Sequence, residues 1–310
     1  KNRKKMSQVV VVTGTSTGIG EAAALHFARE GYSVFAGMRR PEAGEALRSA
    51  ADAEKLDLAI VANDVCDPAS NQSLVDRAIS ESGKIDVLIN NAGIAGGLVI
   101  EELSMEFLRG MMETNFFGAI DLIQRVVPGM RERGSGCILN VSSSAGLVSV
   151  APTMAYSVSK SALEVASEVL AMEMKGFGVR VGIIEPGVVL TPIFGKGAEA
   201  KLDESSPYLK FYNAFDQSML PNFMSPEMPE AVARVMQEAV ETQSPKLRYL
   251  VGSDALALVK ARREMSDEDW VGLGEMKEEE LALKLTQMMG NDRLLNDEEV
   301  AALMTQFSGS

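Results

Sequence analysis

The hydrophobic positions of the chain fall into short runs that alternate with amphipathic segments. Residues 8–13 (QVVVVT) are almost uniformly apolar, as expected of a strand buried on both faces of a parallel sheet. Residues 21–30 then show helical spacing of apolar positions, and Gly31 ends that helix. The same pattern predicts strands at 32–38, 56–62, 85–90, 136–141, 179–185 and 247–251, and helices at 41–55, 70–82, 104–133, 153–175 and 229–242.

These repeated strand–helix units predict an α/β fold with one doubly wound, Rossmann-like parallel sheet of about seven strands. We expect residues 8–264 to form this single domain. Residues 1–7 are expected to be a leader that is disordered or foreign to the native chain; if the native chain begins at Met6, the foreign part is residues 1–5. Residues 265–310 are expected to form a helical C-terminal extension.

Residues 190–228 interrupt the alternation and are rich in large apolar side chains. Because insertions after the carboxyl ends of strands commonly cover a ligand crevice, we expect a mainly helical segment that covers the substrate. Ordinary core beneath an irregular segment is the alternative. In the extension, helices are predicted at 277–289 and 297–307, the latter capped by Asn296 or Asp297. By default we expect the extension to pack on its own subunit. The alternatives are that it packs on a partner subunit or across the crevice.

Composition excludes several classes of function. The net charge of −13 over 310 residues argues against a nucleic-acid backbone or an anionic membrane as partner. A single histidine and two distant cysteines offer no metal cluster. No apolar run approaches the ~20 residues of a membrane helix. The basic start KNRKK shows no cleavage pattern, so the expected location is cytoplasmic.

A glycine cluster, TGTSTGIG, follows the first predicted strand and opens the first helix. Gly14, Gly18 and Gly20 lack the Cβ that would keep a pyrophosphate from the backbone, and the helix N-terminus offers free N–H groups to it. This position predicts a dinucleotide phosphate site. Three residues separate the first two glycines, unlike the common GxGxxG spacing.

The sequence AYSVSK places Tyr156 and Lys160 four residues apart, on one face of a helix. A nearby ammonium is expected to lower the pKa of the phenol from about 10 toward neutrality, where it can exchange a proton with a substrate. The serine run from Ser142 to Ser144 follows a predicted strand and can donate hydrogen bonds to a carbonyl oxygen. Taken alone, a YxxxK pair is more often an ordinary exposed pair.

Together, TGxxxGxG, the NNAG sequence at 90–93, Asn115, the serines before YxxxK, and the pair Pro186 and Gly187 resemble single-domain short-chain dehydrogenase/reductases over about residues 8–252. The resemblance implies that Tyr156 is the general acid or base and that Lys160 activates it and contacts the ribose. It further implies that Ser143 binds the carbonyl and Asn115 holds a proton-relay water. The cofactor contacts it implies are Gly14, Ser16, Thr17, Gly18, Ile19, Gly20, Arg39, Arg40, Asp64, Val65, Asn91, Ala92, Gly93, Tyr156, Lys160, Pro186, Gly187, Val189 and Thr191.

The end of the second predicted strand bears on the choice of cofactor. Family members that bind NAD place an acidic residue there, whereas this chain has Met38 followed by Arg39 and Arg40. The planar, charged guanidinium suits a 2′-phosphate. We therefore expect NADP(H) rather than NAD(H), with Arg39 as the main contact.

The sequences PEMPEAVARV, PKLRYLV and FYNAF resemble the branch that contains 17β-hydroxysteroid and retinol dehydrogenases. That branch implies a bulky hydrophobic alcohol or ketone as substrate. It also implies a homodimer or homotetramer that pairs the helices at 104–133 and 153–175. The only histidine, His26, lies on the first helix, so the substrate-loop histidine of steroid enzymes is absent and a Ser-His-Asp hydrolase is excluded. The alternative is a catalytically silent, nucleotide-binding regulator of the same fold.

Overall fold

The computed structural model describes residues 7–195 and 205–308 of the protein. Residues 1–6 of the expected leader and residues 196–204 of the expected substrate segment lie outside the described residues. None of the helices in the described part of the chain is long and apolar enough to cross a membrane.

Seven strands form one parallel sheet in the order β3-β2-β1-β4-β5-β6-β7. The sheet grows outward in both directions from β1, which confirms the predicted doubly wound α/β fold. The crevice between β1 and β4, where the strand order reverses, is the usual place for a ligand in such folds. The strands are β1 (Val9–Thr13), β2 (Ser33–Met38), β3 (Leu58–Ala62), β4 (Val87–Asn90), β5 (Gly136–Val141), β6 (Val179–Pro186) and β7 (Arg248–Val251).

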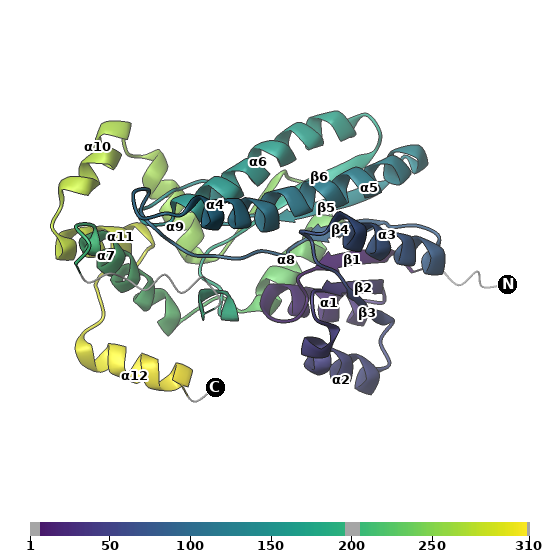
Figure 1. Ribbon diagram of the computed structural model, residues 1–310, viewed down its shortest axis with the longest axis horizontal. Coiled ribbons are helices and arrows are strands. Elements are labelled where there is room, and N and C mark those ends of the chain that lie inside the picture. The colour runs from purple at the N-terminus through teal and green to yellow at the C-terminus, as the bar shows by residue number, and fades with distance from the viewer. Residues whose placement is uncertain (1–6, 196–204, 309–310) are drawn as a thin grey trace.

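The apolar run of β1 is explained by burial on both faces. Val10 and Val12 pack into the core on one side of the sheet, while Val9 and Val11 pack into the core on the other, and none is more than 2% exposed. Figure 1 shows the resulting three layers of helices, sheet and helices. One face is covered by α1 (Gly18–Arg29), α2 (Glu45–Glu54) and α8 (Pro229–Glu241), the other by α3 (Pro68–Ser82), α5 (Gly118–Arg133) and α6 (Met154–Lys175).

Two helices depart from their predicted form. The segment predicted as a helix at 41–55 begins with a 3-10 turn (Pro41–Gly44) before α2. The long helix predicted at 104–133 is α4 (Met105–Met112), a π-helical turn (Glu113–Phe117) and then α5. Such a turn, with its wider hydrogen-bond step, leaves the apolar pattern of a helix almost unchanged, so the sequence does not reveal it.

The C-terminal extension packs on its own subunit, as the default expectation has it. Its helix α11 (Glu278–Met288) lies against α7 (Leu209–Met219) of the expected substrate segment, and they share an apolar cluster with α9 (Ser253–Arg263). Neither α9 nor the short α10 (Asp267–Gly272) was expected, because charged residues interrupt their apolar patterns. This cluster joins the extension to the substrate segment.

The last helix, α12 (Asp297–Ser308), lies beyond α11 at the side of the molecule opposite the N-terminus (Figure 1). Its amino end is capped by Asn296, whose Oδ1 accepts a hydrogen bond from the Glu299 N–H at 2.9 Å. The Glu299 carboxylate in turn accepts from the Asn296 N–H at 2.9 Å. This reciprocal pair confirms Asn296 as the cap.

Candidate active site

The glycine turn between β1 and α1 leaves no room for side chains. Gly14 and Gly18 have φ angles of +70° and +65°, which favour glycine. A Cβ on Gly14 would lie 2.7 Å from the Ala92 Cα, and one on Gly20 would lie 2.2 Å from the Gly14 carbonyl oxygen. The first turn of α1 therefore presents bare backbone N–H groups, as binding of a pyrophosphate requires. Ser16, Thr17 and Ile19 complete the turn and are partly exposed.

The NNAG sequence after β4 supports this turn. The Asn91 side-chain amide donates to the carbonyl oxygens of Thr13 and Gly14 at 2.9 and 3.2 Å. The Thr13 hydroxyl accepts from the N–H groups of Asn91 and Ala92 at 3.1 and 3.0 Å. The Asn91 side chain thus fixes the shape of the glycine turn. Gly93 continues the segment toward the catalytic residues, and a Cβ there would lie 3.5 Å from the Lys160 Nζ.

The ends of β2 and β3 lie beside the glycine turn. Met38 is only 2% exposed, so Arg39 and Arg40 are the first exposed side chains after β2. After β3, the Asp64 carboxylate accepts from the Cys66 N–H at 3.0 Å. Val65 is buried. The two arginines therefore project from the end of β2, which is where the 2′-phosphate of a dinucleotide would have to be bound.

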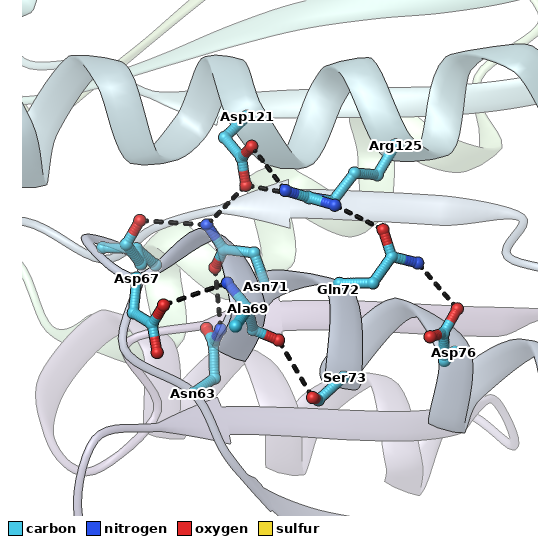
Figure 2. Close-up of polar contacts among 10 residues, drawn as sticks. Asn63, Asp67, Ala69, Asn71, Gln72, Ser73, Asp76, Asp121 and Arg125 are labelled. Carbon is cyan, nitrogen blue, oxygen red and sulfur yellow. Dashed lines mark hydrogen bonds and ion pairs between the residues drawn. The ribbon is translucent and has the colours of Figure 1, made fainter.

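A polar network fixes the turn that follows β3 (Figure 2). The Asn71 side-chain amide donates to the Val65 carbonyl oxygen at 3.0 Å and to the Asp121 carboxylate at 2.8 Å. Asn63 donates to Asn71 at 2.9 Å, and Arg125 forms an ion pair with Asp121 at 2.8 Å. Helices α3 and α5 are thereby connected through the turn that carries Asp64 and Val65.

The end of β6 forms the opposite wall. A Cβ on Gly187 would lie 2.2 Å from the Asp254 carboxylate, which accepts from the Val188 N–H at 2.6 Å. Val189 is buried, and the methyl group of Thr191 would lie 3.0 Å from a Cβ on Gly18. The segment after Pro186 therefore reaches the glycine turn across the crevice. Sequence reasoning missed Asp254, because its supporting role depends on a contact across 66 residues.

Tyr156, Lys160 and Ser143 meet where β5 ends and α6 begins. Tyr156 is partly buried and shares a side-chain hydrogen bond with Ser143. The Lys160 Nζ donates to the Val141 carbonyl oxygen at 2.8 Å and lies 5.8 Å from the centre of the Tyr156 ring. Ser142 and Ser144, in contrast, are buried. The hydroxyl that reaches Tyr156 is thus that of Ser143, the middle serine.

The expected lowering of the Tyr156 pKa is not found. Burial raises the pKa of the phenol, and the hydrogen bond from Ser143 acts in the opposite direction. Burial also lowers the pKa of Lys160 to about 8, which a nearby Glu164 carboxylate counteracts. The sequence predicts the spacing of the phenol and the amine but not the burial of their end of α6.

Asn115 lies in the π-helical turn between α4 and α5 and is 1% exposed. Its side chain bonds to both backbone polar groups of Ile94 and donates to the Ser159 hydroxyl at 2.9 Å. Its Oδ1 would also lie 3.3 Å from a Cβ on Gly93. The structure therefore brings Asn115 to the same end of the sheet as Lys160, with Gly93 between them.

A cavity of about 630 Å³ opens beside this end of α6. Its wall reaches α6 at Met154, Ser157 and Val158, next to Tyr156 in sequence, and it is otherwise lined by the loops at 98–101 and 149–152 and by two aromatic residues at α7, Tyr208 and Phe211. Nearly all of the lining is apolar, and Glu101 is its one charged residue among the described residues. This size is typical of a small-molecule site.

The arrangement fits a nicotinamide dinucleotide. Bare backbone at the glycine turn suits the pyrophosphate, and the ends of β2 and β3 suit the adenosine half. The segment after β6 lies across from the turn, and the Pro186 carbonyl oxygen at its start accepts from the Ser143 hydroxyl at 3.4 Å. No cluster of residues in the described ranges has the composition of a metal site.

Comparison with known proteins agrees with this geometry. The family model for the short chain dehydrogenase matches residues 8–202. Human retinol dehydrogenase 8 is 38% identical over 195 residues, covering 61% of this chain and 61% of that protein. The crystal structure of a short-chain dehydrogenase from Streptomyces avermitilis has a TM-score of 0.76 and 34% identity, covering 88% of this chain and 96% of that chain. A metagenomic short-chain oxidoreductase in complex with NADP has a TM-score of 0.64 and 26% identity, covering 79% and 97%.

These matches place the chain in the class of oxidoreductases built on this sheet. The protein belongs to the short-chain dehydrogenase family. The resemblance inferred from the motifs is thereby confirmed, and so is the resemblance to the branch that contains retinol dehydrogenases.

Proposed function

We propose that the protein is an NADP-dependent oxidoreductase that interconverts a bulky hydrophobic secondary alcohol and its ketone. The observation that carries this proposal is the meeting of the Tyr156 and Ser143 hydroxyls with the buried Lys160 ammonium beside a large apolar cavity. The bound nicotinamide supplies hydride exchange with the substrate carbon. The residues of this chain bind, orient and move the proton.

In this proposal Tyr156 donates its proton to the carbonyl oxygen during reduction and recovers it during oxidation. Ser143 donates a hydrogen bond to the same oxygen and stabilises the negative charge that develops there. Lys160, charged and bonded to the Val141 carbonyl, favours the phenolate as it forms and contacts the ribose. Asn115 completes the set by holding the water through which Tyr156 is reprotonated.

The substrate class is inferred from the cavity. Its apolar lining stabilises a hydrophobic body, and three of its lining residues on α6, Met154, Ser157 and Val158, are neighbours of Tyr156 in sequence. Retinol dehydrogenase 8, whose name gives a bulky apolar alcohol, supports the hydrophobic body of the substrate, although retinol itself is a primary alcohol. We therefore propose a steroid-like, retinoid-like or aryl alcohol or ketone.

The preference for NADP is inferred from the end of β2. Arg39 and Arg40 are exposed there, and the buried Met38 offers no acceptor for ribose hydroxyls. The metagenomic relative in complex with NADP supports this choice. A guanidinium on a 2′-phosphate is worth about 1.5–3 kcal/mol, or roughly 10- to 100-fold in affinity.

The test is a panel of steroids, retinoids and aryl ketones, with NADPH and NADH compared by absorbance for the wild type, Arg39→Ala and Arg40→Ala. We expect NADPH-dependent turnover, with kcat/KM for NADPH lowered about 10-fold or more by Arg39→Ala and less by Arg40→Ala. The rate with NADH is expected to stay unchanged in both. Equal wild-type rates with the two nucleotides would contradict the NADP preference, and nucleotide binding without turnover of any compound would favour a silent regulator.

A further inference from the structure

A buried cluster of charges begins one helical turn beyond Lys160 on α6. Glu164 follows Lys160 by one turn of α6 and is 3% exposed, and Glu185 on β6 is fully buried. Arg248 on β7 lies between them, with ion pairs of 3.1 Å to each carboxylate. The same guanidinium pairs with Glu168 near the surface at 2.6 Å. The mechanism proposed above uses none of these carboxylates.

The cluster lies directly beneath the loop that carries Ser143 in the candidate active site. The loop that carries Ser143 packs directly on it, since a Cβ on Gly146 would lie 2.7 Å from the Ser142 hydroxyl and 3.2 Å from the Glu164 Cγ. Glu185 is the residue before Pro186, and the segment that forms the opposite wall of the crevice begins at Pro186. Changes in this cluster therefore reach both the serine loop and the segment after β6.

Charge balance distinguishes the two glutamates. Apart from Arg248 and Glu164, no described group pairs with either carboxyl oxygen of Glu185. Burial and the neighbouring Glu164 raise the pKa of Glu185 to about 8. Burial raises the pKa of Glu164 as well, but there a hydrogen bond from Ser142 and the Arg248 guanidinium act in the opposite direction. A neutral Glu185 leaves two cations, Lys160 and Arg248, facing two anions, Glu164 and Glu168. An ionised Glu185 would add a buried charge without a cation of its own.

Lys160 needs such an anion. Lys160 is 4% exposed and its ammonium is bonded to one neutral carbonyl oxygen, so burial favours loss of its proton. Of the charged groups nearby, Tyr156 and Glu164 are on the same helix, Glu185 and Arg248 belong to β6 and β7, and Glu164 is the one that raises the pKa of Lys160. The spacing of four residues places Glu164 on the same face of α6 as the amine.

We propose that Glu164 is the counter-ion of Lys160, a positioning residue that is kept ionised by Arg248 and by a neutral Glu185, and that it keeps the ammonium charged where Tyr156 requires it. The amine then loses its proton, and the active site its activator, at a pH set by Glu164. This inference rests on the proposed function only for the role of Lys160 in turnover.

The test measures the titration of Lys160 directly, by ¹³Cε and ¹⁵Nζ NMR of lysine-labelled full-length protein, with the resonance assigned by its loss in Lys160→Met. Wild type, Glu164→Gln, Glu185→Gln and Glu168→Gln are compared. We expect the midpoint of Lys160 to fall by about one pH unit or more in Glu164→Gln. The Lys160 midpoint is expected to fall far less in Glu185→Gln, because the Glu185 carboxyl is already neutral in the wild type. It is also expected to fall far less in Glu168→Gln, the matched control at an exposed position. An unchanged midpoint in Glu164→Gln, or an equal fall in Glu185→Gln, would overturn the proposal.

Two further readouts keep the outcome decisive. If Glu164→Gln does not fold, the ¹³Cδ shift of Glu164 in the wild type decides, because the proposal requires an ionised carboxylate at pH 7 and a protonated one overturns it. In the active enzyme, the alkaline limb of kcat/KM is expected to move with the NMR midpoint in each variant. A shifted midpoint in an enzyme that turns over no compound would contradict the proposed function and still support the counter-ion.

Discussion

Asn115 and Ile94 exchange two hydrogen bonds. The Asn115 Oδ1 accepts from the Ile94 N–H at 2.8 Å, and its Nδ2 donates to the Ile94 carbonyl oxygen at 2.9 Å. This pair connects the segment after β4 with the π-helical turn between α4 and α5, and it does so beside Gly93. A single side chain therefore aligns two walls of the crevice.

Replacing Asn115 by alanine is expected to leave the N–H and C=O groups of the partly buried Ile94 unpaired. Because such groups cost about 1–3 kcal/mol, the free energy of unfolding should fall by that amount, and the affinity for NADPH should fall with it. Urea unfolding and fluorescence titration measure the two effects. Asn213→Ala, which removes a partly exposed amide bonded to Glu278, is the control and should change neither. Unchanged stability in Asn115→Ala would show that the two hydrogen bonds between Asn115 and Ile94 do not contribute to the stability of the fold.

The raised pKa of Glu185 predicts a pH dependence of stability. The folded protein keeps a proton on this carboxyl up to about pH 8, whereas the unfolded chain releases it near the ordinary value of 4.5. Stability from this group is therefore fully present below about 4.5 and is lost as the pH rises toward 8. Glu185→Gln cannot titrate, so its unfolding free energy relative to the wild type should rise across this window by at least about 2 kcal/mol.

Urea unfolding from pH 5 to pH 9 measures this difference, with Glu168→Gln as the matched control on the same arginine. Parallel curves for Glu185→Gln and the wild type would mean that Glu185 is ionised in the folded protein.

The packing of α11 on α7 predicts that the C-terminal extension affects substrate binding. Leu285 is 3% exposed in the apolar cluster shared with α7, whereas Leu283 on the same helix is 37% exposed. Leu285→Ala should lower the free energy of unfolding by about 2–4 kcal/mol and raise KM for the apolar substrate more than it weakens NADPH binding. Leu283→Ala should change little. A loss of NADPH affinity as large as the rise in KM would argue against a local effect on the substrate segment.

An exposed apolar stripe on α6 predicts an oligomer. Val158, Val165, Val169 and Met172 follow one face of the helix and are between 45% and 80% exposed. If this face pairs with a second copy, Val165→Asp should convert the oligomer to a monomer in light scattering at micromolar concentration. Val271→Asp, at a 74% exposed position on α10, is the control. A monomeric wild type would remove the basis for this prediction.

The sequence predicts the strands and the motifs at their ends well, because a parallel sheet buried on both faces imposes apolar runs and glycine turns. Its predictions fail where structure depends on contacts between distant segments. The π-helical turn at Asn115 leaves the helical pattern nearly intact, and the support of Gly187 by Asp254 joins the segment after β6 to the start of α9. The cluster of Glu164, Glu185 and Arg248 is likewise assembled by α6, β6 and β7. The same limit explains the wrong expectation for the Tyr156 pKa, since spacing is visible in the sequence and burial is not.

The most direct test of the proposed chemistry is the rate of NADPH consumption by Tyr156→Phe with the best ketone of the panel, measured beside its NADPH dissociation constant. The account predicts a rate lowered by about 100-fold or more with nearly unchanged nucleotide affinity, because only the phenolic proton is removed. A variant that keeps the wild-type rate would contradict the assignment of Tyr156 as the acid and base.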